Sequence, residues 1–227
     1  MKKKYILVLG SKPDSVLPKK KFIINKIYAA NGSIQRIEKF RLKNKIKIVS
    51  VASLLEFERN MQVQKRVLNA FFDKIIIRAG YVDVKKYFFK NKNFLYKNYT
   101  KWKDVWFQKK FFKYGFLSLV IGESKYQLNL FLKLKHLIKI IFQTQAFGVS
   151  TGFFSIMQAI YENPNCNIIV SGIGLEKGGH FYNKNLIRHN NRANVDKYLM
   201  GHLKKKYKIK LYTLDESMHV LGNVSKL

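Results

Sequence analysis

Two histidines in the carboxyl-terminal third of the chain are the clearest candidates for acid–base chemistry. His180 and His189 flank a polar segment that follows the pair Gly178 and Gly179. A neutral imidazole near pH 7 can accept a proton from a hydroxyl, so it is a natural general base. The two lie nine positions apart without a carboxylate cluster, whereas a catalytic zinc needs three protein ligands. Solvated or packed roles are expected for the remaining histidines, His136, His202 and His219.

Small polar residues at four places are candidates for binding a phosphate or a carboxylate. Those at 10–11, 31–32 and 171–172 follow apolar runs of strand length, and those at 150–152 begin a helical pattern. In a doubly wound sheet the ligand lies beyond the carboxyl ends of the strands, and a helix N-terminus offers unpaired amides. Each group also suits an ordinary turn. Together they predict a nucleotide pocket with these substrate-binding residues: Gly10, Ser11, Asn31, Ser150, Thr151, Gly152, Ser171, Gly172 and His180.

Several familiar signatures are missing from the sequence. It contains no Walker pattern and no complete Gly-x-Gly-x-x-Gly fingerprint, and without a Gly-x-Ser-x-Gly elbow a serine hydrolase is disfavoured. The single cysteine, Cys166, excludes an internal disulfide or a thiolate metal cluster, which is typical of an intracellular protein. We therefore expect no metal and no other cofactor.

Strand and helix patterns alternate along the chain. Apolar runs predict strands at 5–9, 26–30, 46–51, 71–78, 167–171 and 207–212, and helical spacing predicts helices at 52–69, 128–142, 150–160 and 193–206. This order predicts an α/β fold with a doubly wound, mostly parallel sheet. A chain of 227 residues buries roughly 70% of its surface on folding, which suits one domain over 1–227.

The charge of the chain requires an explanation. Lys and Arg number 44 against 13 Asp and Glu, a formal net charge of +31, while 47% hydrophobic residues exclude general disorder. A bias toward lysine on solvated faces explains this as well as an anionic partner does. Of the possible partners, a negative membrane surface ranks before nucleic acid, because arginine, which base readout favours, is scarce.

Two segments bear on membrane contact. The N-terminal apolar run is too short for a signal peptide and is expected to be the first strand, and the most apolar stretches are broken by lysine, as over 130–142. Residues 81–115 mix lysine with Trp102, Trp106 and several Tyr and Phe. Amphipathic helix and loop packed on the core is the favoured interpretation, and a membrane-facing surface is the alternative.

The order of these motifs resembles the bacterial sialyltransferases of glycosyltransferase family 42. The matching stretches are Gly-Ser-Lys-Pro-Asp-Ser at 10–15, Ala-Ala-Asn-Gly at 29–32, Ser-Thr-Gly at 150–152, Val-Ser-Gly-Ile-Gly at 170–174, Gly-Gly-His-Phe-Tyr at 178–182 and Tyr-Lys-Ile-Lys-Leu-Tyr at 207–212. The resemblance runs from residue 4 to about 215 and is strongest over 149–214. It implies a Rossmann-like fold of the GT-A variant type with a small lid, which we place around 175–192.

The resemblance also implies roles for individual residues. It places Asn31 and Ser11 at donor-binding positions and 150–152 at the helix start that holds the nucleotide sugar. Tyr182 falls on one of two tyrosines that bind the leaving phosphate, and His189 falls near the catalytic histidine, the general base. The other phosphate tyrosine is matched by Glu176, and the step from the histidine to the next helix is two residues longer. The donor therefore stays open between sialic acid and another CMP-linked acidic sugar such as Kdo.

The expected function is metal-independent, inverting transfer of an acidic sugar from a CMP-activated donor to a glycan acceptor of lipooligosaccharide or capsule. Expected partners are the CMP-sugar, a glycan or glycolipid and an anionic membrane surface, with peripheral attachment at the cytoplasmic face. The oligomeric state is open, a homo-oligomer included, and no specific nucleic acid is expected. The alternatives are a basic nucleic-acid-binding protein and a nonenzymatic nucleotide-binding module.

Overall fold

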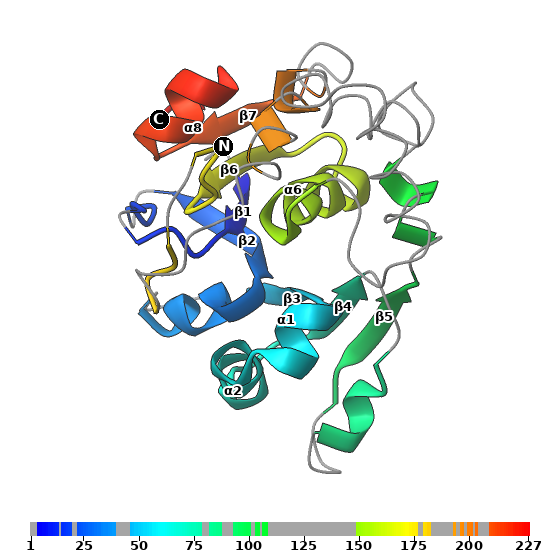
Figure 1. The fold of residues 1–227 in the computed structure, drawn as a ribbon. Helices are drawn as coiled ribbons and strands as arrows, with labels where there is room; N and C mark the ends of the chain where they lie inside the picture. Colours follow the sequence, from blue (N-terminus) through cyan, green and yellow to red (C-terminus); the bar gives the residue numbers. More distant parts are fainter. Residues whose placement is uncertain are drawn as a thin grey trace, which may run out of the picture.

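A single sheet organises the chain in the computed structural model (Figure 1). The structure describes residues 4–13, 15–19, 22–39, 46–78, 82–87, 93–100, 103–104, 106–108, 149–176, 179–182, 193, 196–197, 199–201, 203 and 209–227. The strands are β1 (Lys4–Leu9), β2 (Ile23–Ala30), β3 (Lys47–Ser53), β4 (Lys74–Arg78), β5 (Leu95–Tyr99), β6 (Asn167–Ser171), β7 (Leu211–Thr213) and β8 (Ser225–Lys226). Their order across the sheet is β5-β4-β3-β2-β1-β6-β7-β8, and all seven pairings are parallel.

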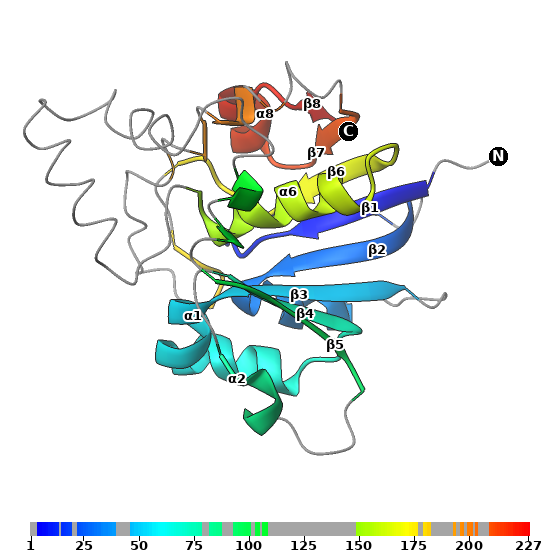
Figure 2. The same cartoon turned by 90° about the vertical axis from the view of Figure 1, so that its right-hand side faces the viewer.

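The strand order reverses between β1 and β6. From β1 the chain builds outward through β2 to β5, and it then returns to add β6, β7 and β8 on the other side of β1. The arrowheads of β1 and β2 point the same way in Figure 2. In open parallel sheets such a reversal opens a crevice at the carboxyl ends of the two strands, where ligands bind.

Helices cover both faces of the sheet. The elements are η1 (Asn31–Lys39), α1 (Leu54–Arg59), α2 (Met61–Asn69), η2 (Val84–Tyr87), α6 (Thr151–Glu162) and α8 (Glu216–Gly222). Ile6 and Val8 of β1 pack in the core that contains α6, whereas Leu7 and Leu9 pack in the core that contains α2. The central strand is therefore apolar on both sides, as a doubly wound parallel sheet requires. Figure 1 shows α6 and α2 on opposite sides of the sheet.

The sequence predicted most of this architecture. The α/β class and the doubly wound arrangement are confirmed, and the sheet is wholly rather than mostly parallel among the described strands. Of the strand expected at 207–212, residues 207 and 208 lie outside the described part, and β7 covers Leu211–Thr213. The helix expected at 52–69 is broken at Asn60 into α1 and α2. Residues 81–115 contain a strand, β5, that was expected to be helix or loop. The helix expected at 128–142 lies outside the described residues.

No helix within the described ranges combines the length and the apolar composition needed to cross a bilayer.

A polar cluster anchors the end of α6 to the amino edge of the sheet. The Glu162 carboxylate accepts hydrogen bonds from Lys26 Nζ (2.8 Å), Lys74 Nζ (2.7 Å) and the Tyr28 hydroxyl (2.6 Å). Burial by itself would raise the pKa of Glu162, but these three donors outweigh it and lower the pKa to about 2. The cluster therefore stabilises the fold whenever Glu162 is ionised.

We expect Glu162→Gln to lower the free energy of unfolding by about 2–3 kcal/mol at pH 7. Because the pKa of Glu162 is depressed in the folded state, its contribution is present above about pH 4.5 and is lost as the pH falls toward 2. Urea unfolding of both proteins at pH 7, 5 and 3 measures the difference, which should shrink with the pH. Glu216→Gln, at an exposed pair with Lys226, is the matched control and should change nothing measurable. A Glu162 effect that does not depend on pH contradicts the assignment.

Candidate functional site

The loops after β1 and β6 meet in backbone contact at the strand-order reversal. Gly10 N donates to Ser171 O (2.7 Å), and Lys12 N donates to Gly172 O (2.9 Å). Gly172 has φ +74, and a Cβ on Gly10 would collide with the carbonyl of Gly172. Glycine is therefore required at both positions, for the left-handed backbone at 172 and for the close approach at 10. Gly10 and Gly172, which the sequence assigned to substrate binding, therefore set the backbone path of the two loops and offer no side chain to a ligand.

Ser11 and His180 come together although 169 positions separate them in the chain. The Ser11 Oγ and His180 Nδ1 atoms are hydrogen-bonded, and Phe181 N donates to Ser11 O (2.8 Å). The His180 ring stacks on Tyr182, with ring centroids 5.0 Å apart and planes 8° from parallel. The short segment 180–182 is thus held against the loop that follows β1, at the carboxyl edge of the sheet.

Tyr182 is packed from several sides. The Arg66 guanidinium of α2 lies 4.7 Å from the centre of its ring, and a Cβ on Gly32 would come within 2.8 Å of the ring. The hydroxyl is buried and lacks a hydrogen bond of good geometry among the described residues. Burial raises the pKa of Tyr182 well above its usual value, and the charge of Glu56 raises it further against the opposing effects of Ser11 and Arg66. The hydroxyl therefore stays protonated and can donate to an anion.

Asn31 stands at the first position after β2 in a left-handed conformation, with φ +50. Its Oδ1 accepts a hydrogen bond from Ser53 N at the end of β3 (3.4 Å). Asparagine tolerates this conformation better than most residues, which explains its place at the turn. A Cβ on its neighbour Gly32 would meet the Tyr182 ring, so Asn31 lies at the same edge of the sheet as the Ser11–His180 pair.

The start of α6 adjoins the same crevice. A Cβ on Gly152 would lie 3.1 Å from Ile173, the residue after Gly172, so glycine lets the helix approach the β6 loop. Ser150 is the N-cap, and its Oγ accepts from Phe153 N (3.1 Å). Thr151, the first helical residue, is buried. The helix N-terminus is in the expected place, but the Ser150 hydroxyl is used within the fold.

A buried ion pair fixes the approach to α6. Arg78, the last residue of β4, is fully buried, and its Nε donates to Asp104 Oδ2 (2.9 Å). Its Nη1 donates to the carbonyls of Val149 (3.0 Å) and Ser150 (3.1 Å). Burial raises the pKa of Asp104, and the charge of Arg78 opposes that rise. Arg78 thus links the carboxyl end of β4 to the N-cap of α6 through hydrogen bonds.

Glu176 is turned toward a lysine. Its Oε1 accepts from Lys12 Nζ (2.5 Å), and the same ammonium donates to the Ser217 hydroxyl (2.9 Å). The hydrogen bond from Lys12 lowers the pKa of Glu176. A carboxylate paired in this way repels an anion less than an unpaired one.

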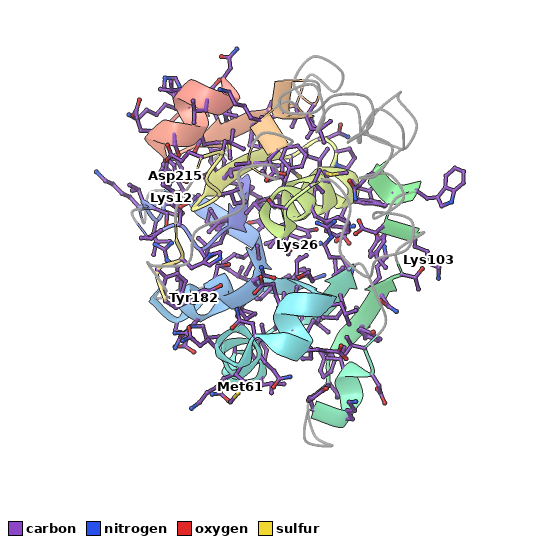
Figure 3. All side chains as sticks on the ribbon, in the orientation of Figure 1. Lys12, Lys26, Met61, Lys103, Tyr182 and Asp215 are labelled. Carbon is purple, nitrogen blue, oxygen red and sulfur yellow. The ribbon has the colours of Figure 1, made fainter. Side chains whose placement is uncertain are left out.

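Asp215, which sequence reasoning missed, fastens these loops together. Its carboxylate accepts from Gly172 N (2.5 Å) and from Val16 N (3.3 Å), and Figure 3 shows it beside Lys12. Burial raises its pKa, and the two amide donors oppose the rise. Its position in the sequence could have indicated this role. Asp215 closely follows the strand β7, and residues that follow parallel strands lie at the carboxyl edge of the sheet, with residues 10 and 172.

The expected site residues divide into three groups. Ser11, His180 and Tyr182 are in contact, with Asn31 beside them at Gly32. Ser150 and Ser171 are engaged within the fold, the second through a hydrogen bond from its Oγ to Val16 O (2.5 Å). His189 and most of the expected lid at 175–192 lie outside the described residues. Within the described ranges, no group of three or more His, Cys, Asp or Glu could hold a metal ion.

The fold and site together define an α/β protein whose described strands form one parallel sheet, with a cluster of polar side chains at the carboxyl edge of that sheet. No protein-family model matches the chain, and no curated protein matches it significantly.

Solved sialyltransferase structures are similar to the chain over nearly its whole length. One is CstII from Campylobacter jejuni in complex with the substrate analogue CMP-3FNeuAc, with 18% identity, 100% of this chain and 86% of that chain covered, and a TM-score of 0.47. Another is CST-II in complex with a trisaccharide acceptor and CMP (17%, 98% and 85%, TM-score 0.45). A third is the monofunctional alpha-2,3-sialyltransferase Cst-I from Campylobacter jejuni (14%, 99% and 79%, TM-score 0.45).

Proposed function

We propose that the chain is a metal-independent, inverting glycosyltransferase that moves sialic acid or a related acidic sugar from a CMP-activated donor to a glycan acceptor. The observation that carries the proposal is the meeting of Ser11, His180 and Tyr182 at the carboxyl edge, beside the β1/β6 reversal. This is the place where a doubly wound sheet binds its ligand. The motif order of the sequence points to the same chemistry.

The residues suit the two halves of the reaction. Attack of a sugar hydroxyl on the anomeric carbon needs a base on the acceptor side and donors around the departing phosphate. The protonated hydroxyl of Tyr182, which makes no hydrogen bond of good geometry among the described residues, is such a donor. The N-terminus of α6, beside Ile173 of the β6 loop, adds main-chain amides at the same edge of the sheet. We assign the base to His189 and donor binding to Asn31 and the glycine loops.

We place the acceptor among the glycans of lipooligosaccharide or capsule, reached by peripheral attachment at the cytoplasmic membrane face. Trp106 is 59% exposed and lies close in sequence to the exposed Lys103, which supports a contact between this region and an anionic surface. Trp102 lies outside the described residues.

A donor screen tests the proposal. CMP release is measured with CMP-sialic acid and CMP-Kdo over a set of glycan acceptors, with UDP-sugars as controls. Turnover of a CMP-linked acidic sugar is expected. Thermal stabilisation by CMP and not by DNA separates this function from nucleic-acid binding. Stabilisation by CMP without turnover of any donor instead supports a nonenzymatic nucleotide-binding module.

Tyr182→Phe should reduce turnover by about 10–100-fold, which is the value of one hydrogen bond to a charged group. Stability should change little, because the hydroxyl that is removed makes no hydrogen bond of good geometry among the described residues. Steady-state kinetics and urea unfolding measure the two effects. Tyr161→Phe, at a half-exposed tyrosine near the far end of α6, is the control that should retain full activity. Equal turnover in the Tyr182 variant and the wild type rejects the role.

A further inference from the structure

His180 is held in a fixed position by two different contacts. Its Nδ1 is hydrogen-bonded to Ser11 Oγ, and its ring lies parallel on Tyr182 at 5.0 Å. The hydrogen bond from Phe181 N to Ser11 O (2.8 Å) fixes the backbone beside it. The hydrogen bond and the stacking together fix the position and the plane of the imidazole, as a side chain that meets a ligand requires.

The surroundings of His180 are rich in hydrogen-bond donors. Arg66 packs on Tyr182, and its Nε is buried without a hydrogen bond among the described residues, as is the Tyr182 hydroxyl. Arg36 of η1 lies 5.4 Å from the ring centre of Phe181. Glu56 of α1 is the acid close enough to affect Tyr182. Arg36 already donates to Ser15 and has Asp215 near it, so the donors left over are the buried Arg66 Nε and the Tyr182 hydroxyl. Two such donors side by side, one of them cationic, call for an acceptor and favour an anionic one.

We propose that His180, oriented by Ser11, is the acid that receives the leaving phosphate next to the Tyr182 hydroxyl. This inference rests on the proposed function and assigns a second catalytic histidine, opposite in role to the base. Ser11 does not touch the reacting atoms in this scheme. It is a positioning residue.

The chemical step balances as follows. The acceptor hydroxyl loses its proton to the base, and its oxygen forms a bond to the anomeric carbon. The bond from that carbon to the phosphate oxygen breaks, and its electron pair stays on the phosphate. The His180 imidazolium gives its Nε2 proton to that phosphate oxygen and becomes neutral, and it regains a proton from solvent after CMP leaves.

Binding of CMP and of cytidine, measured by calorimetry between pH 5.5 and 8.5, tests the inference with the intact chain. His180→Gln should weaken CMP binding by about 10–100-fold below pH 6.5, the cost of a charge-assisted hydrogen bond, and by only a few-fold at pH 8.5. Cytidine, which has no phosphate, should bind both proteins equally. At each pH, the affinity of the wild type for CMP is divided by that of the variant. This ratio removes the titration of CMP itself, because both proteins meet the same mixture of CMP protonation states.

Ser11 supplies a second test, in case the His180 variant does not fold. Ser11→Ala should weaken CMP binding below pH 6.5 and leave cytidine binding unchanged, whereas Ser11→Thr keeps a hydroxyl and should restore it. His219→Gln, on α8 with Nδ1 at the Val224 carbonyl, is the matched control and should bind CMP like the wild type.

The outcomes separate the inference from the function on which it rests. The acid role of His180 is overturned if the variant loses as much affinity for cytidine as for CMP, or if its loss of CMP affinity is the same at every pH. In either case, CMP binding by the wild type leaves the proposed function standing. Failure of the wild-type protein to bind CMP at all overturns the proposed function and the inference with it.

Discussion

Replacing Arg78 by methionine is expected to lower the free energy of unfolding by about 3–5 kcal/mol. The substitution leaves the carboxylate of Asp104 buried without its cation, and a buried charge that loses its partner is strongly destabilising. It also removes the donors to the carbonyls of Val149 and Ser150. Urea unfolding at pH 7 measures the loss.

The double variant Arg78→Met, Asp104→Leu shows whether the isolated charge is the cause. Replacing both members of a buried pair by apolar residues is often close to neutral, so most of the lost stability should return. About 1–2 kcal/mol should still be missing, because the two carbonyls before α6 stay unpaired. If the double variant is less stable than Arg78→Met, the pair does not act as described.

His189→Ala should reduce transferase activity by about 10²–10⁴-fold, the usual value of a general base. The base acts on the acceptor hydroxyl, so CMP binding should be nearly unchanged. Initial rates over a range of pH measure the first effect, and CMP titration measures the second. The rate of the wild-type enzyme should fall at low pH as the base is protonated, and the variant should lack that limb.

The His180 variant is the control for the His189 variant. A variant at His180 should lose CMP affinity, whereas the His189 variant should keep it, so the two profiles differ in kind. Unchanged transferase activity in His189→Ala removes the base assignment. A parallel loss of CMP affinity and activity shows instead that His189 belongs to the donor pocket.

The sequence predicted those strands whose residues are buried on both faces. Tyr5 to Leu9 and Asn167 to Ser171 are short apolar runs that end in glycine or serine, and the structure places them as neighbours in the sheet. The β5 strand escaped prediction because, among the described strands, it pairs with β4 alone, and it is half-buried along most of its length. Its residues, Leu-Tyr-Lys-Asn-Tyr, therefore carry no clear apolar alternation.

The break between α1 and α2 had a readable signal. Asn60 caps α2 by accepting from Val63 N (3.2 Å) and donates its side-chain amide to Glu56 Oε2 (3.0 Å). Asparagine is among the best N-cap residues, but the apolar spacing on both sides of it is helical. The helical spacing of apolar residues predicted one continuous helix over 52–69. In the structure the Asn60 cap ends that continuity, and α2 begins after it.

The candidate site residues were predicted one by one, and their pairing was not predicted. Ser11 was singled out by its place after a strand, His180 by the polar segment that it begins, and Tyr182 by the resemblance to glycosyltransferase family 42. The contacts between Lys12 and Glu176, and between Gly172 and Asp215, join segments far apart in the chain. Such contacts depend on the strand order, which the local pattern does not encode.

The place of β1 at the reversal has a consequence for folding during synthesis. Strands β1 to β5 all lie within the first 99 residues, so this half of the sheet can assemble while the ribosome is still translating. The partner for the other edge of β1 is β6, which is not made until residues 167–171. Until then a nascent chain carries an open strand edge, and Ile6 and Val8 lack the cover of α6. Ribosome pausing in that interval prolongs the state most prone to aggregate, so expression should be more sensitive to translation rate there than after residue 171.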